Sequence, residues 1–238
     1  MVARMGWFKW LVCWFKDSAV WFGTLAQWVS GLGTLAAVAV ALFKDPFFRW
    51  RNRPVLNATL APRGPDCTKA VMSFFDNSGN LIKQQKCYYW RLKVTNAGKG
   101  RAEQVQVYAA ALDKQGADRL FSPVDTFLPM NLTWAHSRSS PPDVFAAGIS
   151  SQLGRHCDLG FVGQPAPGAE CSMALTVEAP PATDNNILHP GVYRLHLLIA
   201  AANASTIACT ATINVTGKWF DDPQTMFRDG LAVSVSVD

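Results

Sequence analysis

The sequence lacks the short motifs by which most catalytic and metal-binding proteins are recognised. No glycine-rich phosphate loop, nucleophile elbow, paired-acid motif or Cys-x-x-Cys occurs in the chain. The four histidines and six cysteines do not have the spacing typical of a zinc site. We therefore expect no catalytic residue, no bound metal and no cofactor.

Charge is also missing from one long stretch. No Asp, Glu, Lys or Arg occurs between Ala19 and Phe43. A helix that rises ~1.5 Å per residue covers about 37 Å over this stretch, more than the ~30 Å hydrocarbon layer of a bilayer. We predict a transmembrane helix over residues 18–43. A cleaved signal peptide is the alternative, since Ala37-Val38-Ala39 fits a cleavage pattern, but the apolar run exceeds the usual core of ~7–15 residues.

Aromatic and basic residues border the predicted span. Residues 1–17 combine tryptophans with lysines and predict a helix that lies along the membrane surface, because such side chains favour the boundary between water and lipid. Residues 44–53 predict a basic juxtamembrane linker. The residues that we expect at the membrane interface are Trp7, Trp10, Trp14, Lys16, Lys44, Arg49, Arg51 and Arg53.

Four tryptophans recur every seven residues, at positions 7, 14, 21 and 28, and on a helix they form one slowly drifting stripe. One interpretation is that residues suited to the interface happen to align. The other is a helix–helix contact, favoured by small residues at four-residue spacing inside the span. The residues of that contact would be Trp21, Trp28, Gly33, Ala37 and Ala41, and they predict self-association.

The net charge of +5 comes from residues before Pro54, so the rest of the chain is neutral. Nucleic-acid binding needs a basic surface on the domain, and we therefore expect none. Three basic residues precede the span and four follow it, which places the following domain in the cytoplasm. The inverted topology is the alternative. Four glycosylation sequons, at Asn57, Asn131, Asn203 and Asn214, are discounted because the alanine-rich composition is typical of bacteria.

Five cysteines follow the span, at positions 67, 87, 157, 171 and 209. An odd number cannot pair completely within one chain, which favours a reducing compartment where cysteine behaves as a small apolar residue. Two disulfides and one spare thiol are the alternative.

Residues 54–238 have a dominant period of two, typical of strands with one face buried and one in water. The clearest example is residues 206–216, where apolar side chains alternate with threonine and asparagine. Turn sequences such as Asn96-Ala97-Gly98-Lys99-Gly100 separate the strands and are expected to supply glycines with positive φ. Many short alternating strands predict an antiparallel β-sandwich. One short helix is expected, capped by Asp222, with Pro223 at its first position and Gly230 past its end.

Two segments carry a resemblance to a known family. Residues 88–112 contain Val94-Thr95-Asn96-x-Gly98 followed by Val105-x-Val107, and Pro190-Gly191-Val192-Tyr193 opens a later strand. Together they resemble immunoglobulin-like sandwiches, and the layout is similar to uncharacterised bacterial proteins that anchor such a sandwich by one N-terminal transmembrane helix. The resemblance implies a tyrosine corner at Tyr193, in which the hydroxyl bonds a nearby backbone group. The family's Cys-Trp-Cys spacing is absent, because Cys87 and Trp90 lie on one predicted strand.

The densest group of reactive side chains is Arg155-His156-Cys157-Asp158. On a strand His156 and Cys157 point to opposite faces, whereas His156 and Asp158 share a face and are within reach of a hydrogen bond to each other. We interpret this pair as structural and keep an enzyme or metal site as the alternative. Trp219 and Phe220 are interpreted as sealing one end of the sandwich, with an exposed contact for a partner as the alternative.

These observations predict a bacterial inner-membrane protein with a single span, whose immunoglobulin-like β-sandwich faces the cytoplasm. We expect it to bind another protein, of unknown identity, and to have no catalytic activity. The first alternative is an extracytoplasmic envelope or adhesion module with inverted topology. The second is an enzyme or metal-binding protein that uses residues 156–158.

Overall fold

The computed structural model describes residues 27–45, 47–48, 50–76, 78–136 and 143–237. The chain forms two compact units, Met1–Arg51 and Asn52–Asp238, each of which is described by itself. The predicted surface helix 1–17 lies outside the described residues, as do Trp21 and Arg49 among the predicted contact residues.

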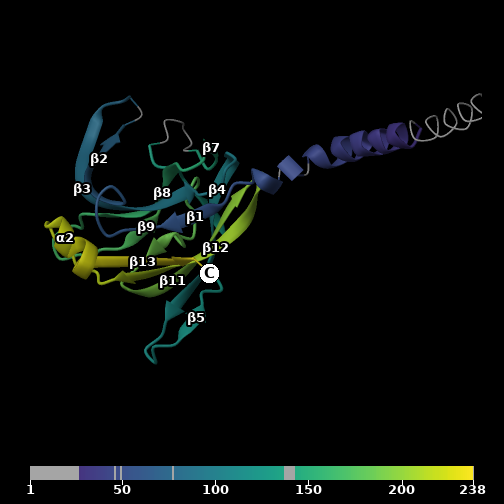
Figure 1. Ribbon diagram of the computed structural model, residues 1–238. Coiled ribbons are helices and arrows are strands. Elements are labelled where there is room, and N and C mark those ends of the chain that lie inside the picture. Colours follow the sequence, from purple (N-terminus) through teal and green to yellow (C-terminus); the bar gives the residue numbers. More distant parts are fainter. Residues whose placement is uncertain (1–26, 46, 49, 77, 137–142, 238) are drawn as a thin grey trace, which may run out of the picture. The chain divides into compact units, whose positions relative to one another are not determined.

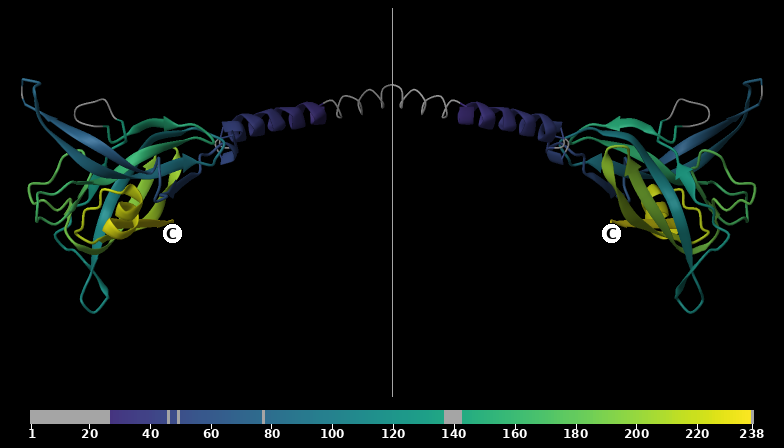
Figure 2. Two further views of the ribbon diagram at one scale, coloured as in Figure 1. Left: turned by 90° about the vertical axis from the view of Figure 1, so that its left-hand side faces the viewer. Right: turned by 90° about the vertical axis from the view of Figure 1, so that its right-hand side faces the viewer.

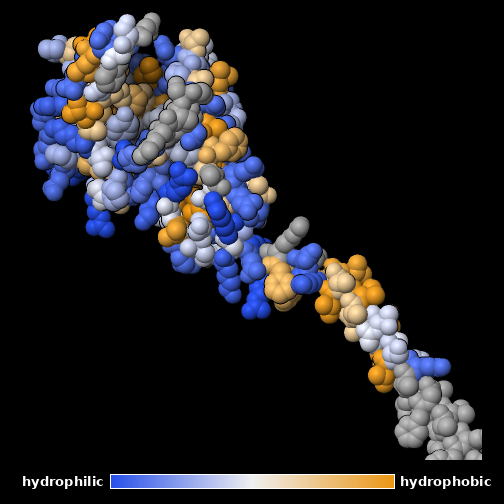
Figure 3. All heavy atoms as spheres, turned by 90° about the horizontal axis from the view of Figure 1, so that it is seen from above, coloured by the Kyte–Doolittle hydropathy of each residue, from blue (hydrophilic) through white to orange (hydrophobic). Residues whose placement is uncertain are grey.

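The first unit contains a helix, Gln27–Asp45, which is long and apolar enough to cross a membrane. None of its apolar window is buried. Eight large apolar side chains on it are at least half exposed, from Val38 at 50% to Trp28 at 71%. Figure 3 shows apolar side chains along its surface.

The second unit is built from two antiparallel sheets, as the period of two predicted (Figure 1). One sheet has the order β1-β3-β8-β9-β10, with β2 also paired to β3; the other has the order β13-β12-β11-β4-β5, with β6 and β7 also paired to β4. The strands are β1 Leu56–Thr59, β2 Cys67–Phe75, β3 Leu81–Asn96, β4 Ala102–Gln115, β5 Phe121–Pro123, β6 Met130–Leu132, β7 Ala146–Ile149, β8 Gly154–Gly163, β9 Met173–Leu175, β10 Ile187–Leu188, β11 Gly191–Ala201, β12 Ala204–Val215 and β13 Leu231–Val237.

The alternation of apolar and polar side chains along the strands explains why the two sheets pack face to face. In β12 the side chains of Cys209, Ala211 and Ile213 are buried, whereas the residues between them are partly exposed. Each fully buried large apolar side chain contributes about 1.5–3 kcal/mol of transfer free energy. The largest side chains in this common core are Trp90, Trp134 and Tyr88, from one sheet and the connection before β7.

Two hairpins extend beyond the shared core (Figure 2). Residues 81–86 of β3 pair only with β2, because β8 begins to pair with β3 at Cys87. The β4–β5 hairpin closes through Gly116, whose N–H donates to the carbonyl of Leu120 at 2.8 Å. Residues 81–86 therefore form a hairpin of two strands, whereas at Asp113 and Lys114 β4 pairs with both β5 and β11.

The turn at residues 96–100 forms where it was predicted, but the expected positive φ at its glycines is wrong. Among the described glycines, positive φ occurs at Gly79, Gly168, Gly191 and Gly217. Gly98 and Gly100 are required for a different reason. A Cβ at Gly98 would collide with the backbone of Val55, and one at Gly100 with the carbonyl of Asn52.

The predicted helix between β12 and β13 is present, with one correction. Helix α2, Pro223–Thr225, begins at the Asp222 cap, whose Oδ2 accepts a hydrogen bond from the Thr225 N–H at 2.8 Å. It continues into a π-helical turn, η1, Met226–Gly230. Gly230 is therefore the last residue of the turn and does not lie past its end, because the wider π turn uses one more residue than an α turn.

The hydroxyl of Tyr193, at the start of β11, donates a hydrogen bond to the carbonyl of His189 at 3.0 Å. This is the contact that the resemblance to immunoglobulin-like sandwiches implies. The two strands that carried the rest of the resemblance, β3 and β4, are consecutive but belong to different sheets.

Candidate functional site

The segment after helix Gln27–Asp45 contains three aromatic residues that the sequence analysis did not use. Phe47, Phe48 and Trp50 are exposed by 51%, 51% and 65%. The ring of Phe47 lies 6.1 Å from that of Phe48 and 6.2 Å from that of Trp50. Aromatic rings beside a span are typical of the membrane interface. In the sequence these rings stand among the basic residues of the predicted linker 44–53, and the same rule of aromatic residues beside a span identifies them.

The predicted interface residues that the structure describes are Lys44, Arg51 and Arg53, and all three are exposed. Of the predicted helix–helix contact, Trp28, Gly33, Ala37 and Ala41 are described and exposed. A Cβ placed at Gly33 would meet no atom within 4 Å. This side of the helix is therefore open, and self-association through it stays a prediction.

In the reactive segment, the hydrogen bond that a shared face allows between His156 and Asp158 is not formed. Nε2 of His156 lies 3.0 Å from Oδ1 of Asp66, in the loop before β2. Asp158 instead accepts a hydrogen bond from Nε of Arg91, on β3, at 2.8 Å. The register of β8 against β3 places Arg91 directly opposite Asp158. The loop before β2 brings Asp66 to His156, because the carbonyl of Asp66 accepts a hydrogen bond from the Arg91 N–H at 2.7 Å.

The third member, Cys157, is fully buried. Its thiol donates to the carbonyl of Thr133 at 3.2 Å, and burial raises its pKa well above the usual value. A thiol in this state is a poor nucleophile, since the thiolate is the reactive form. Among the described residues, no group of three or more His, Cys, Asp or Glu side chains is arranged to hold a metal ion.

All five cysteines of the second unit are buried, and no disulfide joins any two of them. Burial raises the pKa of Cys67 to about 12 and also raises the pKa values of Cys87 and Cys171. The alternative of two disulfides is therefore not what the structure contains.

We expect these five thiols to resist alkylation in the folded protein. In a Cys13→Ser variant, which leaves only the five, a thiol-reactive dye should modify no cysteine in native buffer and all five after denaturation. The protection follows from burial, which excludes the reagent and keeps the thiols protonated. Rapid native modification of any one of them, measured by mass spectrometry, would contradict the burial described here.

Trp219 and Phe220 are half-buried and pack against the core. The ring of Trp219 lies 4.9 Å from that of Tyr88. The Tyr88 hydroxyl donates to the carbonyls of Phe220 and Asp221, at 3.0 and 2.8 Å. These contacts favour the interpretation that the pair seals one end of the sandwich, and a partner would reach only the half of each ring that stays exposed.

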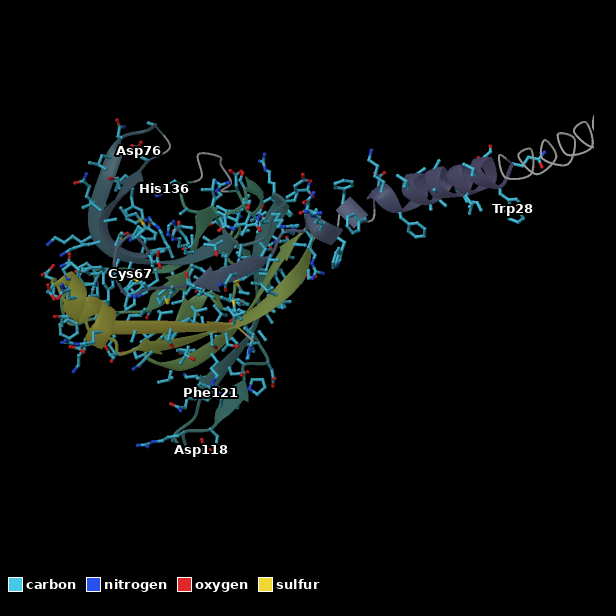
Figure 4. All side chains as sticks on the ribbon, viewed as in Figure 1. Trp28, Cys67, Asp76, Asp118, Phe121 and His136 are labelled. Carbon is cyan, nitrogen blue, oxygen red and sulfur yellow. The ribbon has the colours of Figure 1, made fainter. Side chains whose placement is uncertain are left out.

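Beside this end, a hollow of about 670 Å³ opens on the surface. We call it the β2–β13 hollow, because its walls come from β2 with the loop before it, from the α2–η1 turn and from β13. Figure 4 labels Cys67, where β2 begins. The main lining residues are Pro62, Arg63, Cys67, Lys69, Phe227, Arg228 and Val233. The sequence analysis missed this site, since its walls are more than 150 residues apart in the chain.

The β2–β13 hollow has an apolar floor and a basic rim. Cys67, Phe227 and Val233 are buried, at 2%, 6% and 7% exposure. On the rim, Lys69 lies 3.3 Å from Asp221, and Arg228 lies 2.8 Å from Asp229. Among the described residues that line the hollow, none is acidic.

No protein-family model matches the chain, and neither the curated proteins nor the solved structures contain a significant match.

Proposed function

We propose that the protein is a single-pass membrane-anchored binding module, with the Gln27–Asp45 helix as anchor and the β-sandwich as the part that meets a partner. One observation carries the anchoring: large apolar side chains cover this helix and are exposed. Each side chain left in water lacks the roughly 1.5–3 kcal/mol of transfer free energy that burial would contribute, whereas lipid tails provide the apolar surroundings that these side chains favour. The aromatic rings of Phe47, Phe48 and Trp50 supply the interfacial belt.

We propose the cytoplasmic face of a bacterial inner membrane as the location of the sandwich. The excess of basic residues after the span supports this orientation. The five reduced thiols of the sandwich support it too, because thiols persist in a reducing compartment. An extracytoplasmic module with the opposite topology is the alternative.

Binding is favoured over catalysis by the state of the reactive segment. His156 is engaged by Asp66, Asp158 by Arg91 and Cys157 by the backbone of Thr133. A rigid sandwich commonly presents its contact surface on loops and edges, where the β2–β13 hollow also lies. The partner is proposed to be another protein, and self-association through the membrane helix is compatible with it.

The anchoring is tested by placing charge in the helix. In the variant Leu35→Lys/Val38→Lys, each lysine near the centre of a span opposes insertion by about 2.5–3.5 kcal/mol. We expect the wild-type chain to stay in the membrane pellet after alkaline carbonate extraction and the variant to leave it. The matched control is Leu128→Lys/Val237→Lys, which adds the same charges at exposed positions of the sandwich and should stay in the pellet.

Wild-type protein in the soluble fraction without detergent would overturn the anchoring. The orientation is tested separately by reporters fused to the C-terminus. A reporter that is active only in the cytoplasm should work, and activity of a reporter that works only in the periplasm would establish the inverted topology instead.

A further inference from the structure

We propose that the β2–β13 hollow, defined by Arg63, Cys67, Phe227 and Val233, binds a small organic monocarboxylate, that is, one carboxylate carried on an apolar body. The proposal goes beyond the proposed binding of a protein partner, because it adds a small-molecule ligand, and it rests on that function only in taking the sandwich to be the binding part. It assigns a ligand class to a site that the sequence did not indicate.

The size and floor of the hollow fit the apolar body. Its volume of about 670 Å³ falls within the roughly 300–1,000 Å³ that small-molecule sites usually have. The floor is formed by the Phe227 ring, the Val233 side chain and the Cys67 thiol. Burial raises the pKa of Cys67 to about 12, so this thiol is neutral and acts as an apolar surface.

The rim fits a single negative charge. The ammonium of Lys69 is paired with Asp221, which Lys86 also approaches at 3.5 Å, and the guanidinium of Arg228 is paired with Asp229 through two hydrogen bonds of 2.8 Å. In the described part of the chain, no ion pair involves Arg63. Of the basic residues that line the hollow, Arg63 is therefore the one without an ion pair among the described residues. Because a guanidinium forms a planar fork that matches a carboxylate, Arg63 is assigned as its partner.

The wall formed by the η1 turn is held in place before any ligand arrives. The Thr216 hydroxyl donates to the carbonyl of Gly230 at 2.7 Å, at the end of the turn. The Phe227 ring stands edge-on to Tyr88 and Trp90, at centroid distances of 5.4 and 5.5 Å. A pre-formed site loses less entropy on binding. Single π turns also occur frequently at functional sites.

The test uses the full chain in lipid nanodiscs, with empty nanodiscs as a blank. The probe is 2-naphthoate, and its uncharged counterpart is 2-naphthamide, which has the same ring system without the charge. Binding is measured by isothermal titration calorimetry. We expect the naphthoate to bind wild-type protein at least tenfold more tightly than the amide does.

Three variants locate the site. Arg63→Ala should weaken naphthoate binding at least tenfold and leave the amide unchanged, whereas Ala232→Phe, which fills the hollow, should weaken both probes. Arg119→Ala removes an exposed arginine from the β4–β5 hairpin and should change neither.

The ligand class is overturned if wild-type protein binds neither probe at millimolar concentration, if Arg63→Ala binds naphthoate like wild type, or if inorganic phosphate competes as well as naphthoate does. These failures are separate from failure of the anchoring. A chain that stays in the membrane pellet but binds neither probe retains its anchor and loses only the proposed ligand.

Discussion

Replacing Asn96 by alanine is expected to lower the free energy of unfolding by about 3–5 kcal/mol, because buried polar groups that lose their partners each cost about 1–3 kcal/mol. The Asn96 side chain is fully buried and makes four hydrogen bonds. Its Oδ1 accepts from the N–H groups of Val55 and Gly98, at 3.1 and 2.9 Å. Its Nδ2 donates to the carbonyls of Gly100 and Ile149, at 2.7 and 3.0 Å.

The measurement is urea unfolding of the detergent-solubilised full chain, followed by pulse proteolysis of the sandwich. Asn214→Ala is the matched control, since Asn214 lies exposed on β12, and its loss should change stability by less than about 0.5 kcal/mol. A second variant, Asn96→Asp, keeps the acceptor oxygen but replaces the donating NH2 group by a second oxygen that faces the carbonyls of Gly100 and Ile149, and should also be destabilised. If Asn96→Ala and Asn214→Ala unfold at the same urea concentration, the network does not stabilise the fold.

Replacing Arg91 by alanine is expected to destabilise the protein by about 3 kcal/mol at pH 7, because it leaves a buried carboxylate without its counter-ion. The Arg91 and Asp158 side chains are 15% and 13% exposed and lie 2.8 Å apart. Burial raises the pKa of Asp158 above the usual value, although Arg91 acts in the opposite direction. Removing Arg91 should therefore raise this pKa further.

The raised pKa of Asp158 determines how the stability of the protein depends on pH. Because the pKa of Asp158 is higher in the folded than in the unfolded protein, protonation of this carboxyl favours the folded state. The gain in the free energy of unfolding is complete below the unfolded pKa of about 3.9, and it is lost as the pH rises through the folded pKa. The cost of Arg91→Ala should therefore be largest at pH 7 and shrink toward pH 4, where Asp158 takes up a proton. The double variant Arg91→Ala/Asp158→Asn, which has no charge to bury, should recover stability at pH 7. An equal cost at both pH values, without this recovery, would show that lost packing of Arg91 is the cause.

Patterns that are local in the sequence predicted much of the architecture. The missing charge before Lys44 predicted a helix of membrane-span length, because length and polarity alone decide whether a segment can cross lipid. Alternation predicted strands such as β12 and β13, since the two faces of a strand differ in burial wherever a sheet covers a core. The Asp222 cap was also predictable, because it bonds an N–H only three residues away.

The resemblance to immunoglobulin-like sandwiches correctly anticipated the hydroxyl contact of Tyr193, whose acceptor lies four residues upstream. The expectation failed where a side chain had a choice of partners. His156 and Asp158 were paired from their spacing along one strand, yet each takes its partner from outside β8. Which residue lies opposite depends on sheet register, and spacing within a single strand carries no information about register.

The sequence by itself determined an apolar, uncharged helix and a neutral segment of alternating strands, since both follow from the chemistry of neighbouring residues. Tertiary structure alone decided that β3 and β4 enter different sheets and that the Asn96 side chain hydrogen-bonds to four backbone groups. It also decided that Arg63, Phe227 and Val233 line one hollow. These groups are brought together by long-range packing, in which the burial of many apolar side chains sets the path of the chain. The polar contacts then depend on that path, and no short stretch of the sequence encodes it.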